Sequence, residues 1–235
     1  FACEHAEEIG SIRSARHDFL PFAKSFDAIY AHWGGSYLAL DALKTKELDA
    51  IDALPNPYNA FYRRDDKLAP HNGFTSFARL KEAAQKLGYR IEGKATGYPR
   101  ISDEAVLSTN QNIAIGYPFP YNADFSYAHT TNSYVRSRGG EKEIDAATNK
   151  QVEVKNIIIM RAASRQISPD YNDVDVENEG EATLYRNGEI KKGRWKREGE
   201  RYVFSDEGGQ AFGLVAGKTW ISIVQPDQKV EFTLK

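Results

Sequence analysis

The chain has 235 residues, of which 41% are hydrophobic and 12% aromatic, a composition typical of a folded protein and too apolar for a disordered one. Its 31 Lys and Arg against 33 Asp and Glu leave a net charge of −2, and neither half is basic, which argues against duplex nucleic acid as a main partner. The length allows two domains.

Cysteine content and hydropathy exclude further classes of protein and of site. Cys3 is the only cysteine, so an internal disulfide and a multi-cysteine metal site are excluded. No run approaches the roughly 18 apolar residues that a membrane span needs. The chain opens on Phe1-Ala2-Cys3 without a methionine, so we expect a further region upstream that this chain does not include. We expect Cys3 to be a buried strand-end residue rather than a lipoprotein processing site, because no apolar region precedes it.

The first half of the chain alternates helical patterns with short apolar runs. Residues 15–23 are predicted as a short helix with Ser14 as its cap. Residues 26–31 follow as an apolar strand that ends at a histidine and a glycine pair. Ser36 then caps a helix that ends near residue 43. A strand, a glycine turn and a helix start in succession form the geometry in which backbone N–H groups converge on an anion.

A polar passage with several prolines, residues 52–72, precedes the clearest helix of the chain. The passage predicts a long loop, either functional or a floppy surface segment. Thr75 or Ser76 caps the helix, which spans about residues 77–87 and stops at Gly88. Its apolar positions recur at three and four residues, so one face packs on a core.

After about residue 108 strand-like runs replace the helical periodicity. Asn187-Gly188 is the strongest hairpin signal, since both residues tolerate the positive φ of a tight turn. Strands are predicted at residues 133–136, 154–160, 182–185, 193–196, 202–204, 219–224 and 230–234. The chain is thus predicted to be a two-domain α+β protein. An N-terminal α/β domain of three-layer-like type, lacking its first strands, spans residues 1–107, and a mainly antiparallel β domain, barrel or sandwich, spans residues 108–235.

Three short runs in the first domain combine glycine or turn residues with cationic side chains, as a pocket for an oxyanion requires. Two arginines three residues apart lie close together if their segment starts a helix, and two guanidinium groups can hold a phosphate or carboxylate. A histidine can donate a further hydrogen bond or move a proton near neutral pH. The predicted anion pocket consists of Arg13, Arg16, His32, Gly34, Gly35, Ser36, Arg63, His71 and Asn72.

A structural interpretation of the same residues stays open. In it, the two arginines of the first run pair with Glu7, Glu8 or Asp18 on a wet surface, and such pairs contribute about 0–1 kcal/mol. The glycine pair then serves only the turn, and Asn72 only braces the loop.

A zinc site and nucleophilic catalysis have less support from the sequence. Metal-ligand spacing is missing around the histidines His5, His17 and His129, so no zinc site is expected. Ser36 does not lie in a nucleophile elbow, and no catalytic triad can be assembled.

Aromatic residues of the second half have two interpretations. The run Tyr117–Tyr121 either docks a peptide or glycan or is an ordered linker braced against a domain. Burial in the β core, rather than a binding platform, is expected for Trp195, Tyr202, Phe204 and Trp220.

Several short motifs occur in order and together resemble the YerB-like family of bacterial lipoproteins. They are Gly-x-Ile-Arg-Ser-Ala-Arg at 10–16, His-x-Gly-Gly-Ser at 32–36, Phe-x-Arg at 61–63, Ala-Pro-His-Asn at 69–72, Asn156-Ile157-Ile158-Ile159, Gly180-x-Ala182, Asn187-Gly188, Gly193-x-Trp195-Lys196-Arg197 and Gly217-Lys218-Thr219-Trp220-Ile221. The resemblance implies a two-domain, extracytoplasmic envelope protein without an established activity. It also implies a tether to the cell membrane through an N-terminal lipid anchor that is absent from this chain.

A weaker resemblance concerns mechanism. The layout of residues 11–40 is similar to that of the LytR-CpsA-Psr phosphotransferases, which hold a polyprenyl diphosphate with arginines and need acidic residues for a metal. The acidic candidates here, Asp18, Asp27 and Asp65, do not match that family's positions.

Two hypotheses follow. The preferred one is a non-catalytic envelope protein that needs no cofactor, binds an anionic wall or lipid-linked ligand, and docks a protein or wall partner through its β domain. The alternative is a phosphotransferase or phosphodiesterase that acts on a phosphate-bearing envelope substrate with the help of Mg²⁺.

Overall fold

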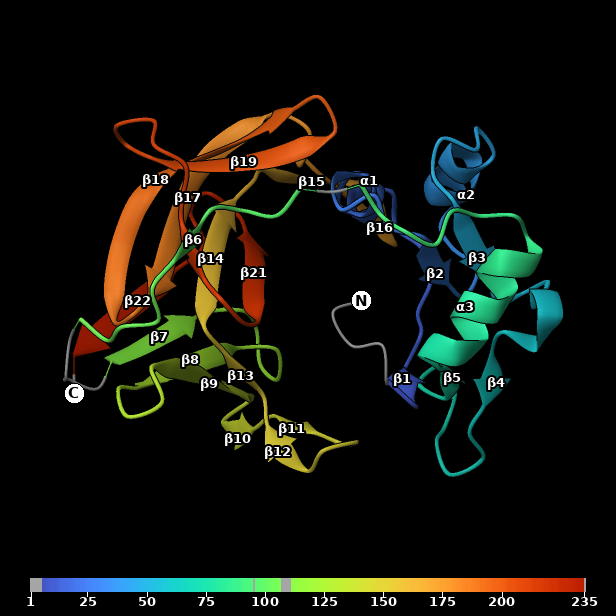
Figure 1. Cartoon of the computed structure of the whole chain (residues 1–235), viewed down its shortest axis with the longest axis horizontal. Helices are drawn as coiled ribbons and strands as arrows, with labels where there is room; N and C mark the ends of the chain where they lie inside the picture. Colours follow the sequence, from blue (N-terminus) through green and yellow to red (C-terminus); the bar gives the residue numbers. More distant parts are fainter. Residues whose placement is uncertain (1–5, 95, 107–110, 235) are drawn as a thin grey trace. The chain divides into compact units, whose positions relative to one another are not determined.

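The computed structural model describes residues 6–94, 96–106 and 111–234, so Cys3 and the predicted boundary at residue 107 lie outside the described residues. The chain forms two compact units (Figure 1). The N-terminal unit takes in Phe1–Thr96, Gln166–Asp173 and Gly199–Arg201, and the C-terminal unit takes in Gly97–Arg165, Val174–Glu198 and Tyr202–Lys235. The chain therefore passes between the units more than once.

The N-terminal unit combines helices with short strands. Its elements are β1 (Ile9–Gly10), a 3₁₀ turn (His17–Phe19), α1 (Leu20–Ser25), β2 (Tyr30–His32), α2 (Tyr37–Leu43), β3 (Ala50–Asp52), a second 3₁₀ turn (Pro57–Asn59), β4 (Tyr62–Arg63), β5 (Gly73–Thr75) and α3 (Phe77–Lys86). The strands β1, β5 and β4 pair antiparallel in that order, and β2 pairs parallel with β3.

Side-chain caps start two of the predicted helices where the sequence indicates. Ser36 Oγ accepts a hydrogen bond from the backbone N–H of Ala39 at 3.2 Å, and α2 follows. Ser76 Oγ accepts one from the N–H of Arg79 at 3.2 Å, and α3 runs from there to Lys86. Both predicted helices are confirmed.

The predicted helix over residues 15–23 is wrong in its first half. Arg16 has an extended backbone, a 3₁₀ turn follows, and α1 begins only at Leu20. The cause is tertiary hydrogen bonding: the N–H of Ala15 donates to the Gly34 carbonyl at 2.8 Å, and the Ala15 carbonyl accepts from the Ser36 N–H at 3.0 Å. Those bonds hold the segment extended, and they outweigh a weak local helical propensity.

The core of the N-terminal unit lies beneath α3. The apolar stripe of the helix contributes Leu80, Ala83 and Ala84, which pack with Ile51 of β3 and with Phe61. This packing fixes the helix relative to β3 and to the start of β4. The N-terminal unit is thus a small α+β layer structure.

The C-terminal unit is built from strands. They are β6 (Arg100–Ile101), β7 (Gln111–Ile115), β8 (Ala123–Ala128), β9 (Ser133–Arg138), β10 (Glu141–Lys142), β11 (Ile144–Asp145), β12 (Lys150–Gln151), β13 (Glu153–Val154), β14 (Asn156–Arg161), β17 (Glu179–Arg186), β18 (Glu189–Glu198), β19 (Arg201–Asp206), β20 (Leu214–Val215), β21 (Thr219–Val224) and β22 (Val230–Leu234). The hairpin β15 (Ser164–Ser168) and β16 (Tyr171–Val174) is shared between the two units.

Two open sheets make up most of this unit. One has the order β10-β9-β8-β7-β22, with β13 also on β9, and the other has the order β19-β18-β17-β14-β21. The predicted hairpin at Asn187-Gly188 is confirmed, because both residues have positive φ and Arg186 pairs with Glu189. The strands β7 and β8 were not predicted from the sequence, and neither was the parallel pairing of β14 with β21.

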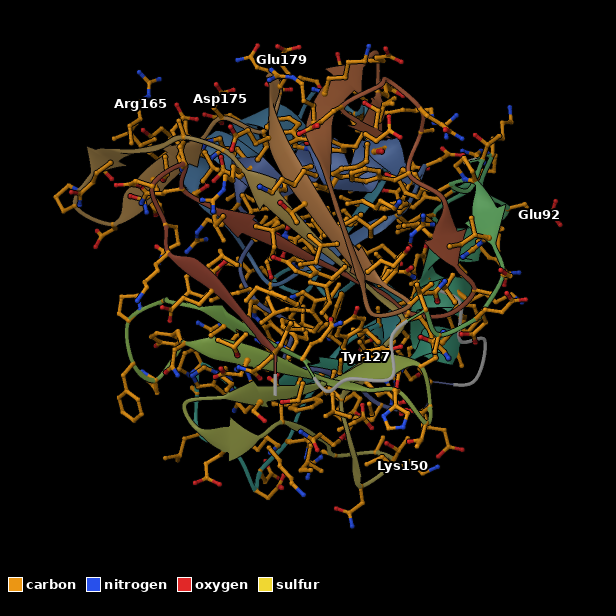
Figure 2. The ribbon with its side chains drawn as sticks, turned by 90° about the vertical axis from the view of Figure 1, so that its left-hand side faces the viewer. Glu92, Tyr127, Lys150, Arg165, Asp175 and Glu179 are labelled. Atoms are coloured by element: carbon orange, nitrogen blue, oxygen red, sulfur yellow. The ribbon has the colours of Figure 1, made fainter. Side chains whose placement is uncertain are left out.

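Both sheets contribute to one core, which contains Phe125 and Tyr134 from the first sheet and Ile157 and Tyr185 from the second. Because the sheets are open, the barrel, one of the two predicted alternatives, is wrong, and the two sheets around one core agree with the other alternative, a sandwich. Figure 2 shows Tyr127 among the strands, where it is buried.

Three of the four aromatic residues that the sequence analysis assigns to the β core, Trp195, Tyr202 and Phe204, are almost completely buried, and Trp220 packs against the core. This prediction is confirmed. None of the described helices has the length and apolar character needed to cross a membrane.

Two buried tyrosines make the stability of the C-terminal unit sensitive to alkaline pH. Burial raises the pKa of Tyr134 and of Tyr202 well above the usual range. In the unfolded chain a tyrosine loses its proton near pH 10. The stability that depends on these protonated, buried tyrosines is therefore fully present below about pH 10, and it is lost as the pH rises toward their pKa in the folded protein. We expect the free energy of unfolding, measured in urea at about pH 8 and about pH 11, to fall less for Tyr202→Phe than for the parent chain. An equal fall contradicts this expectation.

Candidate functional site

A polar turn after β2 supports the candidate site. His32 is buried, and its Nδ1 donates to the Gly34 carbonyl at 2.8 Å. Asp52, at the end of β3, accepts hydrogen bonds from the N–H of Gly34 at 2.8 Å and from the N–H of Leu54 at 3.0 Å. Gly34 has φ +59°, a conformation that favours glycine. Bonds from both β2 and β3 therefore fix the backbone of this turn.

An extended segment from Ile12 to Ala15 runs along the turn. The N–H of Ile12 donates to the Gly73 carbonyl at 2.7 Å, and the Arg13 carbonyl accepts from the Trp33 N–H at 2.9 Å. A Cβ added to Gly35 would lie 2.9 Å from the Cβ of Ala15, so the close approach requires glycine there. The segment thus brings Arg13 beside the residue that follows β2.

The two arginines of the first run do not share a partner. The helix that would have placed them side by side is not formed, and residues three apart on an extended chain point to opposite faces. Arg13 Nη1 donates to His71 Nδ1 at 2.8 Å, whereas the Arg16 guanidinium lies 5.5 Å from the ring centroid of Tyr171. The predicted pair is therefore divided between two places on the N-terminal unit.

Arg13 instead shares a pocket with Arg63. The pocket has a volume of about 170 Å³ and is lined by Ile12, Arg13, Ser14, Trp33, Arg63, Ala69, Pro70 and Gly73. We call it the arginine pocket. Arg63 stacks on Trp33, with its guanidinium carbon 4.3 Å from the ring centroid, and its Nη1 donates to Asn72 Oδ1 at 2.7 Å. Two exposed guanidinium groups from distant parts of the chain thus border one small pocket.

The charges of the arginine pocket are not balanced locally. Among the described residues, no carboxylate lies within ion-pairing distance of Arg13 or Arg63, whose side-chain hydrogen bonds go to His71 and Asn72. His71 Nδ1 must accept in this bond, because a guanidinium only donates. The arginine pocket therefore carries two positive charges and, in the described part of the chain, offers no oxygen ligand set for Mg²⁺.

Arg64 provides the contrast. It forms ion pairs of 2.5 Å with both Glu8 and Asp66. The hydrogen bonds to these carboxylates raise the pKa of Arg64 above its usual range, and the hydrogen bond from Arg64 holds the pKa of Asp66 below its usual range. Two adjacent arginines therefore differ in their availability to a ligand, and only Arg63 is available.

The nine predicted site residues fall into three groups. Arg13 and Arg63 border the pocket, and their partners His71 and Asn72 adjoin it. Arg16 lies apart. The remaining residues build the turn and start α2, and they are His32, Gly34, Gly35 and Ser36.

Sequence reasoning missed Trp33, Pro70 and Asp52 as contributors. Trp33 lies between the predicted His32 and the glycine pair, and an aromatic residue in this turn could have indicated a ring on which an arginine stacks. Asp52 carried no local signal, because its role depends on the pairing of β2 with β3.

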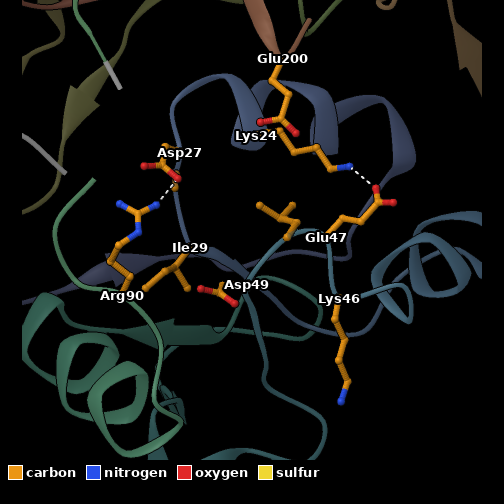
Figure 3. A pocket seen from close by; sticks show the side chains of 10 residues that line it. Lys24, Asp27, Ile29, Lys46, Glu47, Asp49, Arg90 and Glu200 are labelled. Carbon is orange, nitrogen blue, oxygen red and sulfur yellow. Dashed lines mark hydrogen bonds and ion pairs between the residues drawn. The ribbon is translucent and has the colours of Figure 1, made fainter. Parts of the chain in front are cut away.

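A second polar pocket of about 180 Å³ is less suited to an anion (Figure 3). Lys24 pairs with Glu47 at 2.6 Å and Arg90 pairs with Asp27, as the dashed lines in Figure 3 show. The cations lower the pKa of both Glu47 and Asp27. Two further carboxylates, Asp49 and Glu200, line the same pocket, so its cations are largely neutralised.

A larger cleft of about 660 Å³ runs along β1, β2 and α3, and its walls are mainly apolar. Its apolar lining residues include Ile9, Ile12, Ile29, Ala31 and, from α3, Leu80. Such walls give little solvation to an anionic group. Of these three pockets, the arginine pocket has the chemistry that best fits an anion.

Comparisons with known proteins place the chain in a family. Residues 1–90 match the family described as "Protein of unknown function (DUF3048) N-terminal domain", and residues 113–221 match "Protein of unknown function (DUF3048) C-terminal domain". The protein named "Putative lipoprotein YerB" of Bacillus subtilis (strain 168) is 31% identical over 232 residues, which cover 97% of this chain and 70% of that protein.

A solved structure is also similar. The crystal structure of YerB protein from Bacillus subtilis superposes with a TM-score of 0.87 at 28% sequence identity, covering 97% of this chain and 78% of that one. These matches confirm the resemblance drawn from the short motifs. The chain therefore belongs to the DUF3048 family, the family of YerB.

Proposed function

We propose that this protein is an extracytoplasmic, lipid-anchored envelope protein that binds an anionic ligand without catalysis, and that the arginine pocket holds the anionic group. The name of its relative supports the membrane anchor and the compartment. The observation that carries the ligand proposal is the pair of guanidinium groups, Arg13 and Arg63, that face one pocket and have no carboxylate partner among the described residues.

The size of the pocket supports a particular kind of ligand. Pockets that enclose a whole small molecule measure about 300–1,000 Å³. The arginine pocket, at about 170 Å³, has room for a phosphate or carboxylate group and not for a whole nucleotide or sugar. The ligand is then a larger envelope molecule that presents one terminal anionic group. Because a face of Trp33 is already covered by Arg63, stacking of a sugar on that face does not contribute.

The test uses pyrophosphate as the probe in isothermal titration calorimetry. Each charge-assisted hydrogen bond contributes about 1.5–3 kcal/mol, so Arg13→Ala and Arg63→Ala are each expected to weaken binding by about tenfold or more. The double variant is expected to abolish it, with nearly unchanged thermal stability, since both side chains are exposed.

Arg64→Ala is the matched control, because it removes the same charge from the adjacent position while Arg64 is occupied by Glu8 and Asp66. Its affinity for pyrophosphate is expected to stay within about threefold of the parent chain. Equal losses in Arg63→Ala and Arg64→Ala would show that only net charge matters. A large drop in melting temperature for the double variant would mark the arginines as structural.

The alternative, a metal-assisted phosphotransferase at this pocket, lacks support from the surrounding residues. Of its acidic candidates, Asp27 pairs with Arg90, Asp18 lies beside His17, and Asp65 is exposed on the loop after β4. None of the three borders the arginine pocket.

A further inference from the structure

A cluster of metal-ligating side chains lies elsewhere on the N-terminal unit. His17 Nε2 is 3.2 Å from Asp18 Oδ1 and 3.3 Å from Asp173 Oδ1. One ligand atom of each of the three residues lies within 4.8 Å of the other two. His17 and Asp173 are 156 positions apart, so this juxtaposition exists only in the folded chain. His17 was not predicted as a metal ligand, because ligand spacing is missing around it in the sequence and Asp173 comes near it only through the fold.

The spacing of these atoms matches that of ligands on a common ion. Donor atoms about 2.1 Å from a metal in tetrahedral or octahedral geometry lie about 3.0–3.4 Å from one another. The distances from His17 Nε2 to Asp18 Oδ1 and to Asp173 Oδ1, 3.2 Å and 3.3 Å, both fall in that range. The three side chains are only 16–33% exposed, so they differ from acidic groups scattered on a wet surface.

Neighbouring contacts hold the turn that contains His17 and Asp18 against β16, which contains Asp173, independently of the cluster. Tyr171 and Asp173 are alternate residues of β16 and therefore share a face of the strand. The Tyr171 ring contacts the Arg16 guanidinium at 5.5 Å and the Tyr37 ring at 5.9 Å. Arg16 is thus fixed to Tyr171. Because Arg16 precedes His17 and Tyr171 lies on the same strand as Asp173, this contact brings the ligand atoms together before any ion binds.

We propose that His17, Asp18 and Asp173 form a binding site for a divalent transition-metal ion, with Zn²⁺ preferred. An imidazole nitrogen with two carboxylate oxygens suits zinc and its neighbours, whereas Mg²⁺ and Ca²⁺ prefer oxygen ligands alone. Three protein ligands leave at least one coordination position for water or an anion. The site is separate from the arginine pocket and does not depend on the proposed function.

The surroundings of His17 limit the expected affinity. Its Nδ1 is buried without a hydrogen-bond partner among the described residues. A metal-bound imidazole usually donates its other N–H to a carboxylate or carbonyl, and loss of that partner costs about 10–100-fold in affinity. We therefore expect exchangeable binding rather than a permanently held structural ion.

The test is equilibrium dialysis of the chelator-treated chain against Zn²⁺ alone and against Mg²⁺ alone. About one Zn²⁺ per chain is expected at this site, with Mg²⁺ at least about tenfold weaker. Asp173→Asn and His17→Gln are each expected to weaken Zn²⁺ binding at least about tenfold. Asp175→Asn and His129→Gln, which change exposed residues of the same types, are expected to bind as the parent chain does.

Circular dichroism of each variant separates loss of ligation from loss of fold, and the near-isosteric Asp173→Asn keeps the test valid if His17→Gln does not fold. Uptake of no Zn²⁺ by the parent chain would overturn the proposal and leave a hydrogen-bonded ion pair. Equal uptake by all variants would place the ion on other residues and would also overturn it. Pyrophosphate affinity is expected to be unchanged in Asp173→Asn, so failure of either proposal is recognised separately.

Discussion

Asp52→Ala is expected to lower the free energy of unfolding by about 2–4 kcal/mol, because it removes one carboxylate that accepts hydrogen bonds from two backbone N–H groups. Those groups belong to Gly34 and Leu54. The side chain is 24% exposed, so water replaces part of the lost bonding and the cost stays below the sum of two buried bonds. Pyrophosphate affinity is expected to fall as well, since the same turn holds Trp33 beneath Arg63.

Asp52→Asn is the matched variant. It keeps Oδ1 as an acceptor for both N–H groups and removes only the charge, so we expect a loss of at most about 1 kcal/mol. The measurements are urea denaturation and calorimetric titration with pyrophosphate. If Asp52→Ala is as stable as Asp52→Asn, the carboxylate does not support the turn. If it is unstable but binds normally, Asp52 does not position the pocket.

Local rules predicted the elements whose causes are local. Ser36 and Ser76 each cap a helix by accepting a hydrogen bond from the backbone N–H three residues later. A serine directly before a helical pattern predicts such a cap. The hairpin at Asn187-Gly188 depends on two residues that accept positive φ. The predicted strands 219–224 and 230–234 match β21 and β22 in both bounds.

The errors arose where distant segments decide the backbone. Residues 12–15 are extended because Gly73, Trp33 and Gly34 supply their hydrogen-bond partners, and nothing within the segment announces this. The run 154–160 was predicted as a strand, but its place between β17 and β21, parallel to β21, was not, because that pairing depends on segments distant in the sequence. Residues Asn156–Met160 of β14 are buried, so the run shows no alternation between a buried and an exposed face.

The charges of the candidate site could not be predicted from the sequence either. Arg63 and Arg64 are adjacent on the chain, and the motif Phe-x-Arg singled out only the first. The structure gives a physical reason for the difference: the side chain of Arg64 meets Glu8 and Asp66, while that of Arg63 meets Trp33 and Asn72. Neutralisation of a charge is a tertiary property, so a list of basic residues cannot show which of them a ligand can use.

Trp195→Ala is expected to be the most destabilising of these substitutions, at about 3–5 kcal/mol, because it empties a fully buried site in the C-terminal unit. The indole Nε1 donates to the Arg161 carbonyl at 2.8 Å, and the ring lies 6.2 Å from that of Tyr202. A Cβ added to Gly180 would lie 2.6 Å from Nε1, which shows how closely the opposite strand approaches the ring.

Trp195→Phe separates volume from hydrogen bonding at the same position. It keeps an aromatic ring and loses the N–H donor, so we expect about 1–3 kcal/mol from the unpaired Arg161 carbonyl and the smaller ring. Urea denaturation measures both variants, and pyrophosphate affinity is expected to stay unchanged in the folded fraction because the residue lies outside the N-terminal unit. A loss of under about 1 kcal/mol for Trp195→Ala would instead favour an aromatic binding platform over a core role, since an exposed ring stabilises the fold little.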